Sequence, residues 1–131
     1  MEPPEAIMPG SWRDLDWYAG TRLSPGLRAG DLVFVSGCTG ANQYPNDPRA
    51  QIRLAYQYVA EVLEASGAGW DDVVSITTYH VHMRRYIDDV LEIHHEFVKR
   101  EPYPTWTAVG VSELYEPEAI FEVSAIARMQ R

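Results

Sequence analysis

One acidic residue lies on a strand-like segment where a charge needs an explanation. In residues 120–127 the side chains alternate, so Glu122 points away from the face that the strand should bury. The residues predicted on that buried face are Phe121, Val123, Ala125 and Ala127. The segment is too apolar for Glu122 to be freely solvated, so its carboxylate requires a partner, a ligand or a subunit boundary. A structural carboxylate paired with an arginine at a subunit contact and a functional acid fit this pattern equally well.

The only thiol, Cys38, lies in a turn of small residues spanning 36–40. No neighbouring base or cation favours a thiolate, so we expect a buried or pocket-lining cysteine rather than a nucleophile. Small residues in such a turn allow a ligand to approach the backbone, and free amides there can bind an anion.

The four histidines form two pairs, His80 with His82 and His94 with His95. Alternation places the first pair on one face of a strand, whereas adjacent residues of a helix point about 100° apart. No cysteine or carboxylate completes a recognised metal spacing, so we expect no metal site. His94 falls on the apolar stripe of a predicted helix, which indicates a hydrogen-bonded packing residue.

Length and composition predict a single domain over residues 1–131, since 46% of the residues are hydrophobic and 23% are charged. A net charge of −8 disfavours nucleic acid as a partner. One cysteine excludes an intramolecular disulfide and fits a reducing compartment. No apolar run is long enough for a membrane span, and the N-terminus lacks the pattern of a secretory signal. We therefore expect a cytoplasmic protein with no membrane partner.

Residues 1–22 predict an N-terminal arm that packs onto the domain through Trp12, Trp17 and Tyr18. The remaining chain predicts the order β-β-α-β-α-β-β. The first two strands form a hairpin around Gly30 and Asp31, and the last two form an antiparallel pair joined by a loop. The predicted elements are strands near 23–28, 31–36 and 73–82, helices from Asp47 to Gly67 and before Pro102, and strands near 105–111 and 120–127.

This order is typical of an α+β fold in which two helices cover one face of a mixed β-sheet. The opposite face is expected to carry Tyr79, Val81, Trp106 and Ile126. No further element is available to cover these apolar side chains, so another copy of the chain is expected to do so.

Five segments, in order from about Leu23 to the C-terminus, resemble the RidA family, also called YjgF/YER057c/UK114 or endoribonuclease L-PSP. These segments are R-A-G-D-L-V-F-V-S-G at 28–37, V-L-E-A-S-G-A at 62–68, D-D-V-V-S-I-T-T-Y at 71–79, Y-P-T-W-T-A-V-G-V at 103–111 and F-E-V-S-A-I-A at 121–127. The resemblance implies a chorismate-mutase-like fold and a homotrimer built around a central barrel. Three clefts between neighbouring subunits would bind small-molecule substrates.

Family members that hydrolyse enamines and imines such as 2-aminoacrylate hold the substrate carboxylate with an arginine, for which this chain has Trp106. The family glutamate that helps to hold the attacking water corresponds to Glu122. A family tyrosine falls at Leu23, and the helix asparagine has no counterpart around Val90 and Leu91. Since an indole offers one neutral N–H and a large apolar face, 2-aminoacrylate is expected to be a poor substrate.

The resemblance therefore predicts a cofactor-independent imine or enamine deaminase acting on an aromatic or uncharged substrate. Glu122 would activate water, with a main-chain carbonyl near Ala108 as a second acceptor. The predicted substrate-binding residues are Leu23, Gly37, Cys38, Thr39, Tyr79, Trp106 and Ala108. The alternative is a trimer of the same fold that binds a metabolite without catalysis. A ribonuclease, as the older family name implies, fits poorly with the negative charge and the lack of a basic aromatic surface.

Overall fold

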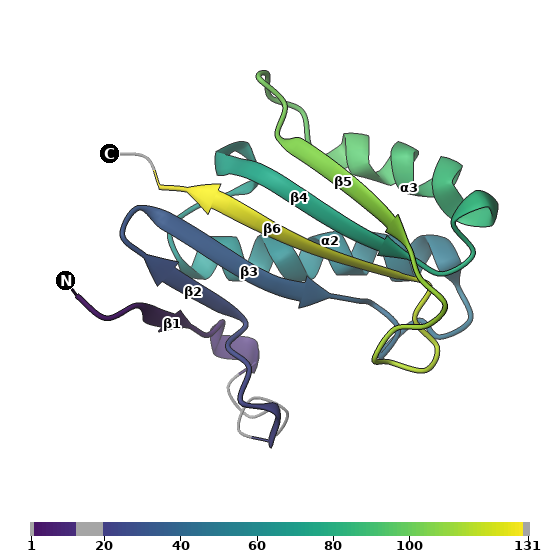
Figure 1. The fold of residues 1–131 in the computed structure, drawn as a ribbon, viewed down its shortest axis with the longest axis horizontal. Helices are drawn as coiled ribbons and strands as arrows, with labels where there is room; N and C mark the ends of the chain where they lie inside the picture. Colours follow the sequence, from purple (N-terminus) through teal and green to yellow (C-terminus); the bar gives the residue numbers. More distant parts are fainter. Residues whose placement is uncertain (1, 13–19, 130–131) are drawn as a thin grey trace.

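The computed structural model describes residues 2–12 and 20–129, which form a six-stranded sheet with two long helices. The strands are β1 (Glu5–Ile7), β2 (Gly26–Ala29), β3 (Leu32–Cys38), β4 (Val73–His80), β5 (Thr105–Gly110) and β6 (Phe121–Arg128). The helices are α2 (Pro48–Ala65) and α3 (Met83–Phe97), with short 3₁₀ turns η1 (Gly10–Trp12) and η2 (Trp70–Asp72). Both long helices lie on one face of the mixed sheet, as the sequence predicts (Figure 1).

The strands follow the order β1-β2-β3-β6-β4-β5, and only the β4–β5 pair is parallel. The predicted pairing of the last two strands is therefore wrong, because β6 lies between β3 and β4 (Figure 1). The burial pattern explains this arrangement. Alternate residues of β6 are buried, whereas five of the six residues of β5 are exposed. The apolar strand takes a central position and the exposed strand forms an edge.

Local signals determine the ends of α2. The side chain of Asp47 accepts a hydrogen bond from the Ala50 amide at 3.1 Å, and Pro48 is the first helical residue. After the helix, Gly67 has a φ of +87°, a backbone conformation that favours glycine. The predicted beginning and end of this helix are confirmed.

Strand β4 differs from the predicted segment at both ends. It ends at His80, and His82 lies beyond it at the start of α3, with a φ of 56°. The prediction that His80 and His82 lie on one face of a strand is therefore wrong. At the other end the pairing with β6 is irregular between Val73 and Ser75, and Val73 is buried while Val74 is exposed. An irregularity of this kind interrupts the strict alternation of a strand, so the side chains before it and after it no longer lie on the faces that alternation predicts.

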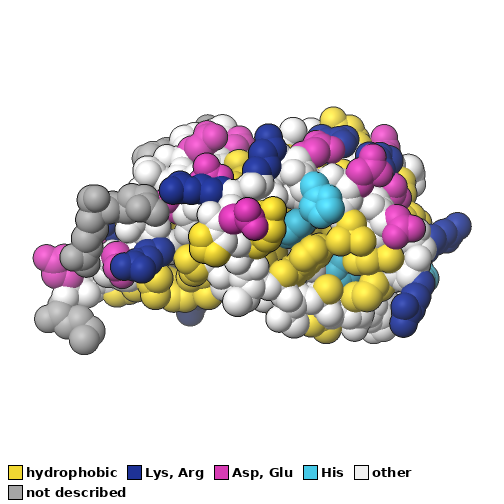
Figure 2. Space-filling model, turned by 90° about the horizontal axis from the view of Figure 1, so that it is seen from above, with side chains coloured by type: hydrophobic (Ala, Val, Ile, Leu, Met, Phe, Trp, Pro, Cys, Tyr) yellow, Lys and Arg dark blue, Asp and Glu magenta, His cyan; other side chains and the backbone are white. Residues whose placement is uncertain are grey.

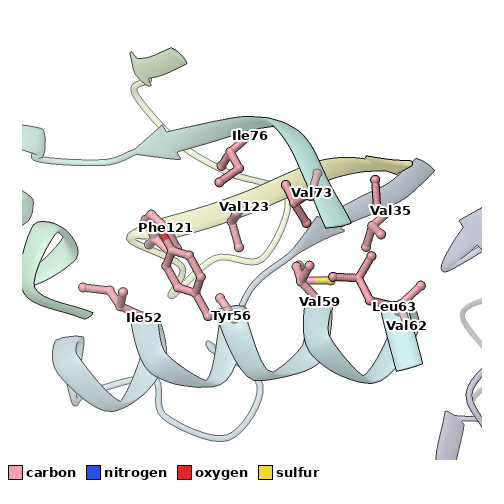
Figure 3. Close-up of a cluster of buried hydrophobic side chains, with 14 of the residues drawn as sticks. Val35, Ile52, Tyr56, Val59, Val62, Leu63, Val73, Ile76, Phe121 and Val123 are labelled. Carbon is pink, nitrogen blue, oxygen red and sulfur yellow. The ribbon is translucent and has the colours of Figure 1, made fainter. Parts of the chain in front are cut away.

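The core lies between the sheet and the helices (Figure 3). Tyr56 of α2 is fully buried, and its ring is stacked with the rings of Phe97 and Phe121 at centroid distances of 5.2 and 5.6 Å. On α3 the buried residues include Val90, Ile93 and His94. Leu91, next to Val90 on the same helix, is 38% exposed.

The N-terminal segment adds an edge strand that the sequence does not predict, since β1 pairs with β2. Trp12 packs edge-on against Tyr58 of α2 with a centroid distance of 5.5 Å. Trp17 and Tyr18 lie outside the described residues.

The face of the sheet away from the helices is called here the open face. It carries partly buried side chains of β4 and β6, namely Tyr79, Glu122 and Ile126, and an exposed Phe34 on β3. No described helix covers this face (Figure 1).

Candidate functional site

Glu122 lies on the open face, as the alternation in β6 predicts. It pairs in register with Tyr79 of β4, and its side chain is partly buried. On the other side of β6, Gly37 of β3 leaves room for the carboxylate. A Cβ atom at Gly37 would lie 2.5 Å from Glu122 Oε2 and 2.7 Å from Cδ. The glycine therefore allows the acid to lie across the backbone of the neighbouring strand.

Burial raises the pKa of the Glu122 carboxyl above its ordinary value of 4.5. Among the described residues the carboxylate has no hydrogen-bond donor and no cationic partner. No arginine in this part of the protomer pairs with Glu122, and the alternative of an arginine at a subunit contact stays a prediction. A desolvated carboxylate with unused acceptor oxygens is suited to hold and deprotonate a water molecule.

Substitution of Gly37 by alanine tests this arrangement. The added methyl group displaces the flexible carboxylate rather than the backbone, so we expect the pKa of Glu122 to shift toward its ordinary value while the fold is retained. NMR titration of the Glu122 carboxyl carbon measures this change. Gly69→Ala is the matched control, since a Cβ atom there meets nothing within 4 Å. An unchanged titration in Gly37→Ala would show that the two residues are not in contact.

Cys38 does not face the open side of the sheet. It is 8% exposed, belongs to the hydrophobic core, and its Sγ donates to the Ser36 carbonyl at 3.3 Å. Burial, followed by the charges of Glu122 and Glu61, raises the pKa of the thiol to about 12. The expectation of a buried cysteine is confirmed, and its assignment as a substrate contact stays a prediction.

Trp106 also lies away from the open face. In the parallel β4–β5 pairing it is in register with Ile76 of the buried side, and its Nε1 donates to Thr78 Oγ1 at 2.9 Å. Its indole is stacked on His94 of α3, with a centroid distance of 3.9 Å and an interplanar angle of 8°. The prediction that Trp106 lies on the open face of the sheet is therefore wrong, and a cleft between subunits that contains both Trp106 and Glu122 stays a prediction. The reason is the pairing of β5 with β4, which turns residue 106 toward the helices.

Trp106 belongs to a buried polar network that the sequence predicts only in part. Thr78 Oγ1 lies 2.7 Å from His80 Nε2, and the Tyr56 hydroxyl lies 2.6 Å from His94 Nδ1. Burial, with a smaller contribution from the neighbouring His95, lowers the pKa of His94 to about 4. The prediction that His94 is a hydrogen-bonded packing residue is confirmed.

Acid is expected to destabilise the fold through His94. Between about pH 6.5 and 4 the unfolded chain binds a proton that the folded chain does not, so stability falls as the pH falls across this range. We expect a loss of about 2 to 3 kcal/mol. Urea unfolding of the wild type and His94→Gln at pH 7 and pH 4.5 measures this loss, which the variant should largely lack. His95→Gln, at an exposed position, should retain it. Equal pH dependence in all three proteins would contradict this assignment.

The other predicted site residues are distributed over both sides of the sheet. Tyr79 lies beside Glu122, and Thr39, which follows the last residue of β3, is partly buried. The turn predicted over 36–40 is wrong for Ser36, Gly37 and Cys38, because these residues belong to β3. Ala108 is exposed on β5 and shares the side of Trp106. Leu23 lines a groove of about 440 Å³ together with Phe34 of the open face and Ser36, and Glu122 is not part of that lining. Of the predicted site residues, Glu122, Gly37 and Tyr79 adjoin one another on the open face.

A second groove, of about 590 Å³, lies at the C-terminal end of α3. Its lining includes Trp70, Glu96 and Arg100 and none of the predicted site residues. In residues 2–12 and 20–129 no three metal-binding side chains are grouped to hold an ion. Within the same ranges, neither long helix has the length and apolar character that crossing a membrane requires.

Sequence reasoning overlooked Gln51, which is 1% exposed. A signal was available, because Gln51 lies four residues before Ala55 and eight before Val59 on the buried stripe of α2. An amide at such a position must find partners inside the protein.

The side of the molecule formed by α3 and β5 has a distinct surface. Figure 2 shows hydrophobic side chains gathered around histidines on this side. Exposed apolar residues of these elements include Leu91 and Val109, each 38% exposed, and Tyr103 just before β5 is 63% exposed. This apolar edge lies next to Trp106 and Ala108.

Comparisons with known proteins agree with the fold and the sequence segments. The model of the family described as endoribonuclease L-PSP matches residues 16–129. RutC family protein YjgH of Escherichia coli is 35% identical over 127 residues, which cover 95% of this chain and 94% of that protein. A protein of Dermatophagoides farinae named 2-iminobutanoate/2-iminopropanoate deaminase is 32% identical over 98 residues, 70% of this chain and 73% of its own length.

A solved structure extends the similarity to three dimensions. Rv2704 of Mycobacterium tuberculosis, described as a member of the YjgF/YER057c/UK114 family, has a TM-score of 0.82 and 28% identity, and the match covers 97% of this chain and 100% of that one. The ordered segments, the α+β fold and these matches lead to one conclusion. The chain belongs to the endoribonuclease L-PSP family, the RidA family that its sequence resembles.

Proposed function

We propose that this protein hydrolyses the C=N bond of a small imine, or of the enamine in equilibrium with it. The observation that carries the proposal is the carboxylate of Glu122, which lies partly buried on the open face beside Gly37 and has no partner among the described residues. The Dermatophagoides farinae relative is named as an imine deaminase, and this name supports the reaction class.

The chemistry requires one positioned acid–base group and no cofactor. Glu122 accepts a proton from water as the water oxygen attacks the imine carbon. The C=N double bond becomes a single bond and its nitrogen takes up a proton. Glu122 returns to this nitrogen the proton that it took from water, then accepts the hydroxyl proton and transfers it to the amine, so that ammonia leaves as the C=O bond forms. A pKa raised by burial makes Glu122 a stronger base than an ordinary carboxylate.

The two parts of the proposed site lie on opposite sides of one sheet, since Glu122 and Tyr79 are on the open face and Trp106 and Ala108 are on the other. One ligand can therefore contact both parts only if a second copy of the chain supplies one of them. Apolar side chains on the open face, among them Phe34 at 39% exposure, favour coverage by another copy. A homotrimer with substrate clefts between subunits is consistent with these requirements.

The contacts of Trp106 limit the substrate class. Its N–H is donated to Thr78 and one ring face is covered by His94, so the remaining surface offers no hydrogen-bond donor for a carboxylate. The free part of the indole suits an apolar or aromatic group. We propose an uncharged or aromatic imine in place of 2-aminoacrylate. With its single, buried cysteine, the protein is proposed to act in the reducing cytoplasm.

A panel of aryl, alkyl and α-carboxylated imines, with ammonia release as the measurement, tests the proposal. We expect turnover of aryl or alkyl imines above the uncatalysed rate and weaker acceleration for 2-aminoacrylate generated in situ. Calorimetry with the same compounds separates the rival function. Saturable binding without acceleration of any member of the panel would indicate a metabolite-binding protein and would contradict an enzyme of this class.

A further inference from the structure

Gln51 joins two segments that are far apart in the sequence. Its Nε2 donates to the Tyr44 carbonyl at 3.0 Å and to the Glu118 carbonyl at 3.2 Å. Its Oε1 accepts from the Ile120 amide at 2.7 Å. All three bonds go to backbone groups, and the side chain is almost completely buried. This set of bonds is called the Gln51 clamp.

Both clamped segments are continuous with the proposed site. Ile120 lies two residues before Glu122, so the clamp fixes the chain where β6 begins. Tyr44 lies in the loop that follows β3, the strand that carries Gly37, and its amide donates to the Gly40 carbonyl at 3.0 Å. A side chain on Gly40 would collide with the backbone carbonyl of Gln51. Figure 1 shows the loop after β3 and the loop between β5 and β6 side by side at the end of the sheet where α2 begins.

These contacts leave little freedom at this end of the site. Beyond the clamp, the Ile120 carbonyl accepts from the Val81 amide at 2.9 Å, so the residues before Glu122 are held on both sides. The carboxylate of Glu122 has no hydrogen bond of its own among the described residues. Its position therefore depends on the backbone that carries it and on contact with Gly37.

We propose that Gln51 is a positioning residue for Glu122. By holding the start of β6 against the loop that follows β3, it keeps the carboxylate at the place where water is activated. The expected effect of Gln51 on catalysis rests on the proposed function. Its effect on the position of the Glu122 carboxylate does not depend on that function.

Gln51→Glu is a selective test because it retains the acceptor for the Ile120 amide and loses both donated bonds, which go to Tyr44 and Glu118. Gln57→Glu is the matched control, since it makes the same change at an exposed position of α2. For Gln51→Glu we expect kcat on an imine substrate to fall roughly tenfold or more, with a smaller change in KM, because small displacements of reacting groups are costly. The NMR titration of the Glu122 carboxyl should shift as well.

The outcomes separate the inference from the proposed function. If a folded Gln51→Glu protein has the same Glu122 titration and the same kcat as Gln57→Glu, Gln51 is merely structural and the inference fails. If the wild type accelerates no imine, yet the Glu122 titration moves only in Gln51→Glu, the positioning role stands and the proposed function fails.

Amide exchange in the wild type provides a measurement that does not depend on the folding of a variant. The Ile120 amide should exchange much more slowly than that of Glu113, an exposed residue of the same loop. Equal exchange rates would show that the clamp does not form in solution, and the inference would fail.

Discussion

Glu122→Gln should lower the rate of imine hydrolysis by roughly 10²- to 10⁴-fold, the usual contribution of a positioned general base. Glutamine has nearly the same shape as glutamate but cannot take a proton from water, so the fold should be retained while the chemistry is lost. Unfolding by urea and the oligomeric state in solution should match those of the wild type. The matched control is Glu64→Gln, the same change at an exposed position of α2.

The pH profile gives a second measurement of the same effect. Since burial raises the pKa of Glu122, the acid limb of kcat/KM should have its midpoint above 4.5, with activity falling as the pH falls through it. The residual activity of Glu122→Gln should lack that limb. A variant with wild-type rates would remove Glu122 from the mechanism and leave metabolite binding as the better account of the open face.

Trp106→Arg should raise kcat/KM for α-imino acids such as 2-aminoacrylate by about tenfold or more, because a guanidinium forms bidentate, charge-assisted bonds with a carboxylate. The substitution also removes the stack on His94 and the hydrogen bond to Thr78. We therefore expect the free energy of unfolding to fall by about 1 to 3 kcal/mol. Steady-state kinetics and urea unfolding measure the two effects on the same preparation.

Trp106→Phe is the matched control, since it keeps an aromatic ring, loses the bond to Thr78 and adds no charge. It should lose stability without any gain on α-imino acids. If Trp106→Arg is folded and gives no gain either, residue 106 does not face the substrate carboxylate in the assembled protein. The correspondence of this position with the family arginine would then be wrong.

The sequence predicted those features that depend on neighbouring residues. The turn at Gly30, the cap at Asp47 and the orientation of Glu122 follow from local conformational preferences and from the two-residue period of a strand. Each is settled within a few residues, and each agrees with the structure.

Features that depend on distant partners were not predicted. The choice of β4 rather than β6 as the neighbour of β5 decides which way Trp106 faces, and no local pattern encodes that choice. The same holds for Gln51, whose bonds reach Glu118 and Ile120 across 67 and 69 residues. The pairing irregularity near Val73 also changes which side chains of β4 share a face. It was not predicted because it depends on the pairing of β4 with β6.

The central position of β6 has a consequence for biosynthesis. This strand is the last element of the described chain to leave the ribosome, yet β3 and β4 are joined only through it. Until residues 121–128 emerge, both of those strands have an unpaired edge and the core lacks Phe121 and Val123. The nascent protein therefore completes its fold only after translation of β6. Before that point it exposes apolar surface and unpaired strand edges, the features that chaperones would bind.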